Sequence, residues 1–171
     1  MLRRPIERHT LKPFIFPKDF VLIQDSREQL PLFPENDIPK GLQIINKCLP
    51  YGDYSFEGGI DLYVIERKSL GDFYGYIGNQ RDKTQRKMEE FREIKDKGGW
   101  VGLVIEATED DIFQGYYRSQ VPPEVARQSM VSFSIRSGVH FYFNRDRDKI
   151  GRWVVDHLVK GYRVLQEKEV K

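Results

Sequence analysis

Two acidic residues and a lysine have types and a spacing that could form a hydrolytic metal site. Asp53 is followed, beyond a Gly-Gly pair typical of a hairpin, by Glu66-Arg67-Lys68. If the flanking strands pair, the carboxylates of Asp53 and Glu66 can face each other. Converging carboxylates repel unless a cation lies between them, and Mg²⁺ or Mn²⁺ would relieve that repulsion with oxygen ligands. The spacing therefore predicts a divalent metal held by Asp53 and Glu66.

Lys68 and Asp72 would complete such a site. Side chains alternate between the faces of a strand, so Lys68 should share a face with Glu66, while Arg67 points the other way. Beside a bound metal, Lys68 would orient or help to deprotonate a water molecule and neutralise charge in the transition state. Asp72, where the chain turns into a helix, would be a further metal ligand, directly or through water, or would fix Lys68. This chemistry suits hydrolysis of a phosphodiester.

A lone Glu-x-Lys on a strand is weak evidence, because paired charges there usually form a solvated face. The composition permits the stronger interpretation without requiring it: 28 Lys and Arg residues face 26 Asp and Glu residues, and the formal net charge is +2. Cys48, the single cysteine, excludes an internal disulfide framework and a thiolate zinc cluster. With no apolar run near the ~20 residues that cross a bilayer and no secretory signal, we expect an intracellular protein that is not secreted and has no membrane partner.

The elements that must position these residues follow from hydrophobic runs and breaker residues. We expect a proline-containing N-terminal arm at 1–19 and one domain at 20–171. The domain should be of the α/β class, with a central mixed sheet flanked by helices on both faces. A proline-rich loop at 30–41 should interrupt it. The expected strands are 20–23, 42–49, 53–56, 62–68, 100–106 and 139–143; the expected helices cover most of 69–97, then 122–138 and 146–167.

The motif also resembles a known family. Gly52-Asp53, a spacer and then Glu66-Arg67-Lys68-x-x-x-Asp72 is similar to the motif of the XPF-type structure-specific DNA endonucleases, a branch of the restriction-endonuclease-like superfamily. The resemblance extends over the blocks Asp25-Ser26-Arg27-Glu28, Leu49-Pro50-Tyr51-Gly52-Asp53-Tyr54 and Val104-Ile105-Glu106, and over Arg81 and Gln85. The proline-rich segment 31–39 departs from the family, where a helix is common.

The resemblance implies a restriction-endonuclease-like fold and an Mg²⁺- or Mn²⁺-dependent endonuclease. It implies that Asp53 and Glu66 hold the metal, with Asp25 as a nearby acidic contributor. It further implies cleavage of branched, flapped or junction DNA, leaving a 5′-phosphate and a 3′-hydroxyl. A homodimer, or a heteromeric partner that supplies DNA-structure specificity, is left open by the sequence.

Four residues are candidates for contact with DNA, and each has a plainer alternative. Arg27 would reach a phosphate from the rim of the site, or would form a turn with Glu28 in which the two satisfy each other. Arg67 would support the site or contact a phosphate, or form a surface ion pair. Arg81 and Gln85, one helical turn apart, would contact DNA or belong to a solvated helix surface.

Two further choices stay open. The tyrosines, among them Tyr116 and Tyr117, could stack on unpaired bases, although in a chain this rich in aromatics most should belong to the core. The rival functions are a non-catalytic DNA-binding or scaffolding module of the same fold, and a nuclease that acts on ordinary duplex ends or on RNA.

Overall fold

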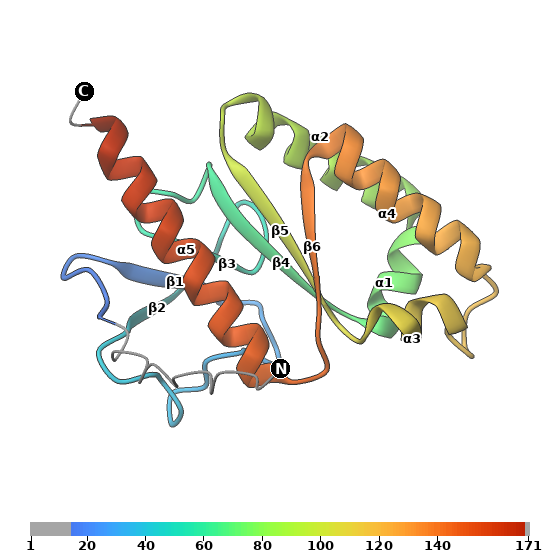
Figure 1. Cartoon of the computed structure of the whole chain (residues 1–171), viewed down its shortest axis with the longest axis horizontal. Helices are drawn as coiled ribbons and strands as arrows, with labels where there is room; N and C mark the ends of the chain where they lie inside the picture. Colours follow the sequence, from blue (N-terminus) through green and yellow to red (C-terminus); the bar gives the residue numbers. More distant parts are fainter. Residues whose placement is uncertain (1–14, 170–171) are drawn as a thin grey trace, which may run out of the picture.

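Six strands form one mixed sheet in the computed structural model, which describes residues 15–169 (Figure 1). Their order across the sheet is β2-β1-β3-β4-β5-β6. Most of the arm expected at 1–19 lies at positions 1–14, outside the described residues. The strands are β1 (Val21–Asp25), β2 (Gln43–Lys47), β3 (Tyr54–Phe56), β4 (Tyr63–Ser69), β5 (Trp100–Glu106) and β6 (Val139–Phe143).

Within residues 15–169, five helices connect and cover these strands, where the sequence predicted three. Among the described residues, no helix has the length and apolar character that crossing a bilayer requires. The helices are α1 (Leu70–Ile77), α2 (Arg81–Asp96), α3 (Glu109–Gln114), α4 (Pro123–Ser137) and α5 (Arg147–Glu169).

One strand, β3, runs against its neighbours. It pairs antiparallel with both β1 and β4, whereas the other neighbouring pairs of the sheet are parallel. The residue that precedes β3, Asp53, therefore lies at the same edge of the sheet as the carboxyl ends of β1 and β4. The β3–β4 hairpin lies at the opposite edge. The reversal thus gathers Asp25, Asp53 and Glu66-Arg67-Lys68 at one edge.

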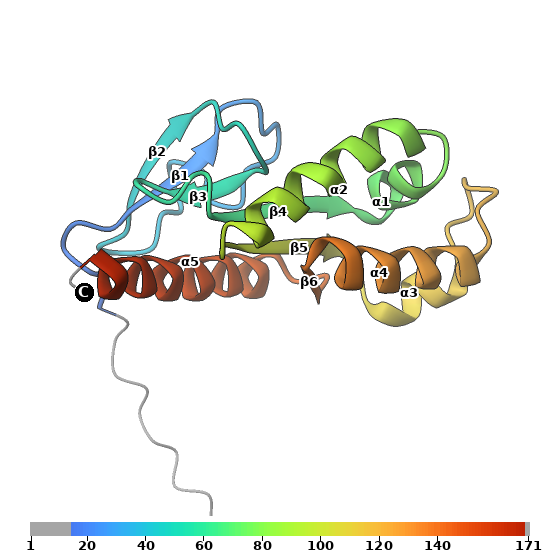
Figure 2. The same cartoon turned by 90° about the horizontal axis from the view of Figure 1, so that it is seen from above.

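Alternate residues of β5 pack into two different cores. Val101, Leu103 and Ile105 join a cluster that includes residues of α1, α2 and α4, whereas Val104 joins the cluster of α5. Figure 2 shows α5 along one side of the sheet and α2 along the other. Both faces of this central strand are covered, as its nearly continuous apolar composition predicted.

The segment expected to be mostly one helix, Ser69 to Lys97, forms two. Ser69 caps α1: its hydroxyl oxygen accepts the backbone N–H of Asp72 at 3.1 Å. Gly78 ends α1 with φ −99° and ψ −104°, outside the helical region, and α2 begins at Arg81. Glycine and asparagine favour helices weakly, so the Gly-Asn-Gln sequence after α1 supplies the break.

Candidate active site

A cleft of about 430 Å³ opens at the edge of the sheet where these polar residues meet. Strands β1 and β4, the start of β3 and the helices α1 and α2 all contribute to it. The cleft brings together most of the site residues that the sequence predicted. Its lining comprises Asp25, Arg27, Glu28, Gln29, Leu30, Gly52, Asp53, Glu66, Arg67, Lys68, Asp72 and Lys87.

Asp53 is positioned by hydrogen bonds to strand β4. Its backbone N–H donates to the carbonyl of Ile65 at 2.8 Å, and its Oδ2 accepts the backbone N–H of Arg67 at 2.7 Å. Gly52, just before it, has φ +65°, and a Cβ there would lie 2.8 Å from the Ile65 carbonyl oxygen and closer still to Val64. Only glycine fits this turn, so Gly52 fixes how Asp53 enters the cleft.

The carboxylates of Asp53 and Glu66 share a poorly solvated part of the cleft. Burial, followed by the neighbouring charge of Glu66, raises the pKa of Asp53 to about 7. Glu66 is 3% exposed, and its Oε1 lies 2.5 Å from the Lys68 ammonium. Its Oε2 is buried and accepts no hydrogen bond, although the Lys87 ammonium is 3.3 Å away. The cleft therefore holds a carboxylate oxygen that is available to a further cation.

Lys68 lies on the same face of β4 as Glu66, as the alternation of side chains predicted. Its ammonium is paired with Glu66 and lies 5.3 Å from the ring centre of Tyr76. Burial alone would lower the pKa of Lys68, but the charges of Glu66, Asp53 and Asp72 outweigh burial and raise it. Lys68 is therefore a positively charged group within the cleft at neutral pH.

The carboxylate of Asp25 already accepts hydrogen bonds from other residues of the protein. Arg27 donates to both oxygens, at 2.9 and 2.7 Å, and the backbone N–H groups of Arg27 and Leu49 donate at 2.7 and 2.9 Å. The side-chain hydrogen bond from Arg27 outweighs burial and lowers the pKa of Asp25 to about 2. Arg27 thus pairs with Asp25 and not with Glu28, the partner considered from the sequence. Asp25 lines the cleft with all these donors already in place.

Asp72 stands at the start of α1, at the rim of the cleft. Its Oδ2 accepts the Ser69 hydroxyl at 2.7 Å, while its backbone N–H donates to the same Ser69 oxygen. Its charge also contributes to raising the pKa of Lys68. Asp72 therefore lies in the first turn of α1 and adds negative potential to the cleft.

Arg67 makes its ion pairs on the other side of β4 from Glu66, as predicted, although it and Glu28 also line the margin of the cleft. Its guanidinium lies 2.7 Å from Glu28 and 3.0 Å from Glu106, and its side chain is 10% exposed. Arg147, from the start of α5, also pairs with Glu106. These residues form an ion-pair network that ties α5 and the loop after β1 to the central strand.

Arg81 and Gln85 do not join the cleft. Both are exposed and line a groove between α2 and α4, together with Arg136 and Ser132. Lys87, which the sequence analysis did not single out, enters the cleft from α2 instead. Its position three residues after buried Thr84 and four before buried Phe91 places it beside the buried stripe of α2, a signal that helical periodicity could have provided.

The donors in the cleft fit a hard divalent cation. Asp53 and Glu66 offer carboxylate oxygens, one of them buried and without a hydrogen bond, and their mutual repulsion favours a cation between them. Proteins commonly hold Mg²⁺ with one or two carboxylates, and water and substrate phosphate complete its shell. Within residues 15–169 no three His, Cys, Asp or Glu side chains form a metal-binding group. The protein's part of such a site would therefore be these two carboxylates.

Comparison with known proteins relates this geometry to a family. The model of the ERCC4 domain matches residues 24–157. XPF from Aeropyrum pernix has a TM-score of 0.59 at 20% sequence identity, covering 81% of this chain and 59% of that one. The structure titled "XPF from Aeropyrum pernix, complex with DNA" has a TM-score of 0.59 at 19% identity, covering 87% of this chain and 66% of that one. The chain thus spans less than two thirds of these solved chains, and no curated protein sequence matches it.

Proposed function

The chain belongs to the ERCC4 domain family, and from this premise we propose that it is a DNA endonuclease dependent on Mg²⁺ or Mn²⁺. The match covers most of the chain, and the solved structures share the restriction-endonuclease-like fold. DNA is proposed as the substrate because XPF from Aeropyrum pernix has been solved in complex with DNA. We extend the proposal to branched, flapped or junction DNA. A second copy or a heteromeric partner would add structural specificity.

The observation that carries the proposal is the meeting of Asp53, Glu66 and Lys68 in one cleft. The Oε2 of Glu66, which accepts no hydrogen bond, and the carboxylate of Asp53 would hold the metal. When bound, the ion would polarise the scissile phosphodiester and lower the pKa of a coordinated water. Lys68, charged and already next to Glu66, would donate to the attacking water or to a phosphate oxygen as negative charge develops.

The other predicted residues take supporting roles in this proposal. Asp25 would act as a supporting acid that holds Arg27 at the mouth of the cleft, where the side chain of Arg27, 66% exposed, can reach a phosphate. Asp72 would keep Lys68 charged. Arg81 and Gln85 would contact the DNA backbone outside the cleft, from the groove between α2 and α4.

The test is a comparison of flap and plain duplex DNA incubated with Mg²⁺. Lys68→Ala should lower the cleavage rate by about 10²–10³-fold, because one preorganised cation near the developing charge is worth that much. DNA affinity, measured by fluorescence anisotropy with Ca²⁺ replacing Mg²⁺, should change less than about threefold, because outer phosphate contacts supply most of it.

Lys149→Ala is the matched control, since this lysine is 68% exposed and lies on α5. It should leave both cleavage and affinity unchanged. A Lys68→Ala protein that cuts at the parent rate would remove the proposed mechanism. Faster cutting of the flap than of the duplex would support the proposed substrate, and equal rates would contradict it.

A non-catalytic DNA-binding module is the second candidate. It is favoured by the occupied carboxylate of Asp25 and by the lack of a three-acid cluster within the described part of the chain. Titration with Mn²⁺ separates the two functions. The nuclease requires Mn²⁺ binding that disappears in Asp53→Asn, whereas the non-catalytic module predicts no such binding.

A further inference from the structure

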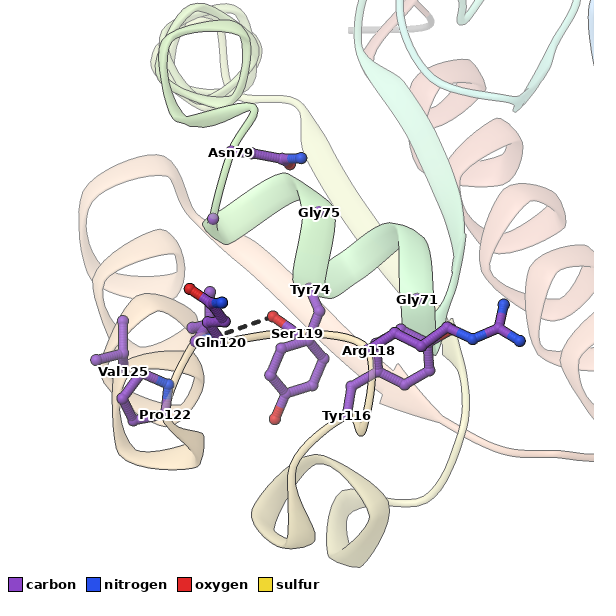
Figure 3. Close-up of a pocket in the computed structure, with 12 residues that line it drawn as sticks. Gly71, Tyr74, Gly75, Asn79, Tyr116, Arg118, Ser119, Gln120, Pro122 and Val125 are labelled. Atoms are coloured by element: carbon purple, nitrogen blue, oxygen red, sulfur yellow. Dashed lines mark hydrogen bonds between the residues drawn. The ribbon is translucent and has the colours of Figure 1, made fainter.

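A second hollow borders a different face of α1 from the one that borders the cleft. It has a volume of about 660 Å³ and runs between α1 and the loop that leads into α4 (Figure 3). Gly71, Gly75 and Gly78 of the α1 side form its floor, and Figure 3 shows Tyr116 and Ser119 on the loop opposite. We call this hollow the α1 groove. Its volume lies in the range of pockets that hold small organic groups, roughly 300–1,000 Å³.

The three glycines are not equivalent. A Cβ on Gly71 would lie 3.0 Å from the Tyr116 hydroxyl oxygen, and one on Gly78 would lie 2.9 Å from Val121. At Gly75, between them, the nearest atoms would be the side-chain amides of Asn79 and Gln80, both at 3.8 Å. The α1 groove is therefore tight near Gly71 and Gly78 and has more room beside Gly75.

The mouth of the α1 groove carries an exposed aromatic side chain and a cation. Tyr117 is 83% exposed, and its ring centre lies 5.2 Å from that of Tyr116, which lines the groove. The Arg118 guanidinium lies 5.1 Å from the centre of the Tyr117 ring. Among the described residues that line the groove, Arg118 is the single charged one. An exposed aromatic beside arginine is the combination with which proteins stack bases and attract a phosphate backbone.

We propose that the α1 groove and the segment Tyr116–Arg118 bind an unpaired DNA strand. One base would stack on Tyr117, the next would enter the groove over Gly75, and Arg118 would contact a phosphate. The amides of Asn79 and Gln120, which also line the groove, can bond to the edge of any base. This inference rests on the proposed function, because it assumes that the ligand is DNA.

The position of the α1 groove relative to the cleft suits a substrate that occupies both. Gly71 lines the groove and its neighbour Asp72 lines the cleft, so both hollows border the first turn of α1. A helix is about 10 Å across, a span of on the order of three nucleotides at duplex spacing. A substrate with an unpaired strand a few nucleotides from the scissile bond could occupy both places. Flapped and forked DNA have that form.

The test is binding of a labelled oligothymidylate of about 12 nucleotides, within the usual range of site sizes, measured by anisotropy without divalent metal. Tyr117→Ala should weaken this binding about tenfold, the effect of losing one stacked base. Affinity for a blunt duplex of equal length should change less than twofold. Phe113→Ala is the matched control, an aromatic that is 42% exposed on α3 and lies outside the segment Tyr116–Arg118; it should change neither affinity.

A second variant, Gly75→Leu, places a side chain in the open part of the α1 groove. Leucine favours a helix more than glycine does, so the melting temperature should be maintained or rise while oligothymidylate affinity falls. An unchanged oligothymidylate affinity in Tyr117→Ala, or equal losses for oligothymidylate and duplex, would overturn the inference. So would a folded Gly75→Leu protein with the parent's affinity.

The oligothymidylate-binding test can fail or succeed independently of the cleavage test. A protein that cuts no DNA, yet binds oligothymidylate through Tyr117, would remove the proposed nuclease function and leave the strand site in place. A protein whose cutting depends on Lys68, with oligothymidylate binding indifferent to Tyr117, would retain the function and remove the strand site.

Discussion

The charged side chains on the two faces of β4 differ in how fully they are paired within the protein. On one face, Arg67 is paired with Glu28 and Glu106 and is almost fully enclosed. On the other face, Glu66 keeps a buried oxygen without a hydrogen bond, and Asp53 is held next to it with a raised pKa. The first arrangement pairs every charge within the protein, whereas the second leaves a buried carboxylate oxygen that lies near ammonium groups but accepts no hydrogen bond.

Within Glu66-Arg67-Lys68, this difference separates a charged residue that stabilises the fold, Arg67, from charged residues that serve the proposed function, Glu66 and Lys68. Removing one member of a buried, satisfied network leaves its partners uncompensated, so the cost should appear in stability. Removing a group from an unsatisfied cluster should relieve repulsion, so the cost should appear in activity. Substitutions on the two faces therefore have opposite expected signatures.

The largest effect is expected for Glu66→Gln. Cleavage of flap DNA with Mg²⁺ should fall roughly a thousandfold or more, since metal stabilisation of a phosphodiester transition state is worth several kcal/mol. The free energy of unfolding, measured in urea without metal, should change by less than about 1 kcal/mol, because lost pairing with Lys68 is offset by relief of repulsion with Asp53. A large loss of stability with activity retained would show that this face is structural too.

Arg67→Met should show the opposite signature. Glu28 would remain largely buried without this partner, and Glu106 would keep only Arg147, at a cost of about 3–5 kcal/mol in the free energy of unfolding. Urea unfolding measures the loss. Arg127→Met is the control, because its pair with Glu124 is exposed on α4 and should have no measurable effect. A stable Arg67→Met protein that fails to bind DNA would instead assign Arg67 to the substrate.

The pH dependence of stability tests Asp53. Between its ordinary pKa of 3.8 and its folded pKa of about 7, the folded protein holds a proton that the unfolded chain has released. The stabilisation is therefore complete below about pH 4, declines as pH rises and is lost above about pH 7, each pKa unit being worth about 1.4 kcal/mol. Asp53→Asn should remove this slope in urea unfolding at several pH values, and Asp61→Asn, at an exposed position, should not.

Metal binding should oppose the decline in stability that the titration of Asp53 causes as pH rises. Mg²⁺ binds the ionised carboxylates, so it should raise the melting temperature more at about pH 8 than at about pH 5.5. Equal shifts at the two pH values, or an equal shift in Asp53→Asn, would show that the ion binds elsewhere.

The smallest effect is expected for Lys87→Met. The ammonium of Lys87 lies 3.3 Å from the free oxygen of Glu66 and is 28% exposed, so it competes with a metal there through a partly solvated interaction. Its removal should tighten Mn²⁺ binding about fivefold in calorimetry, equivalent to ~1 kcal/mol. Weaker Mn²⁺ binding would mean that Lys87 holds Glu66 in place for the metal.

Local rules were enough to predict β4 and its two faces. The alternation over Glu66-Arg67-Lys68 placed Glu66 with Lys68 and sent Arg67 the other way, and the glycine pair indicated the hairpin that brings Asp53 alongside. These features depend on neighbours in sequence or on one tight turn, so patterns of residue types determine them.

Features that depend on packing between elements could not be predicted from the sequence. The pairing of Arg147 with Glu106 joins residues 41 apart, and the choice of Lys87 over Arg81 and Gln85 depends on how α2 is rotated against the sheet. The engagement of Asp25 by Arg27 was also missed, because several short-range partners were available to each. Pairings of this kind are decided by which groups remain unsatisfied once the elements pack.

The reversed direction of β3 has a practical consequence for engineering. Its turn into β4 projects from the margin of the sheet that is farthest from the proposed chemistry. Gly58, in that turn, is exposed and has open space around it. A linker, a fluorescent reporter or an extra nucleic-acid-binding module could be spliced in at Gly58, and the two carboxylates would keep their alignment.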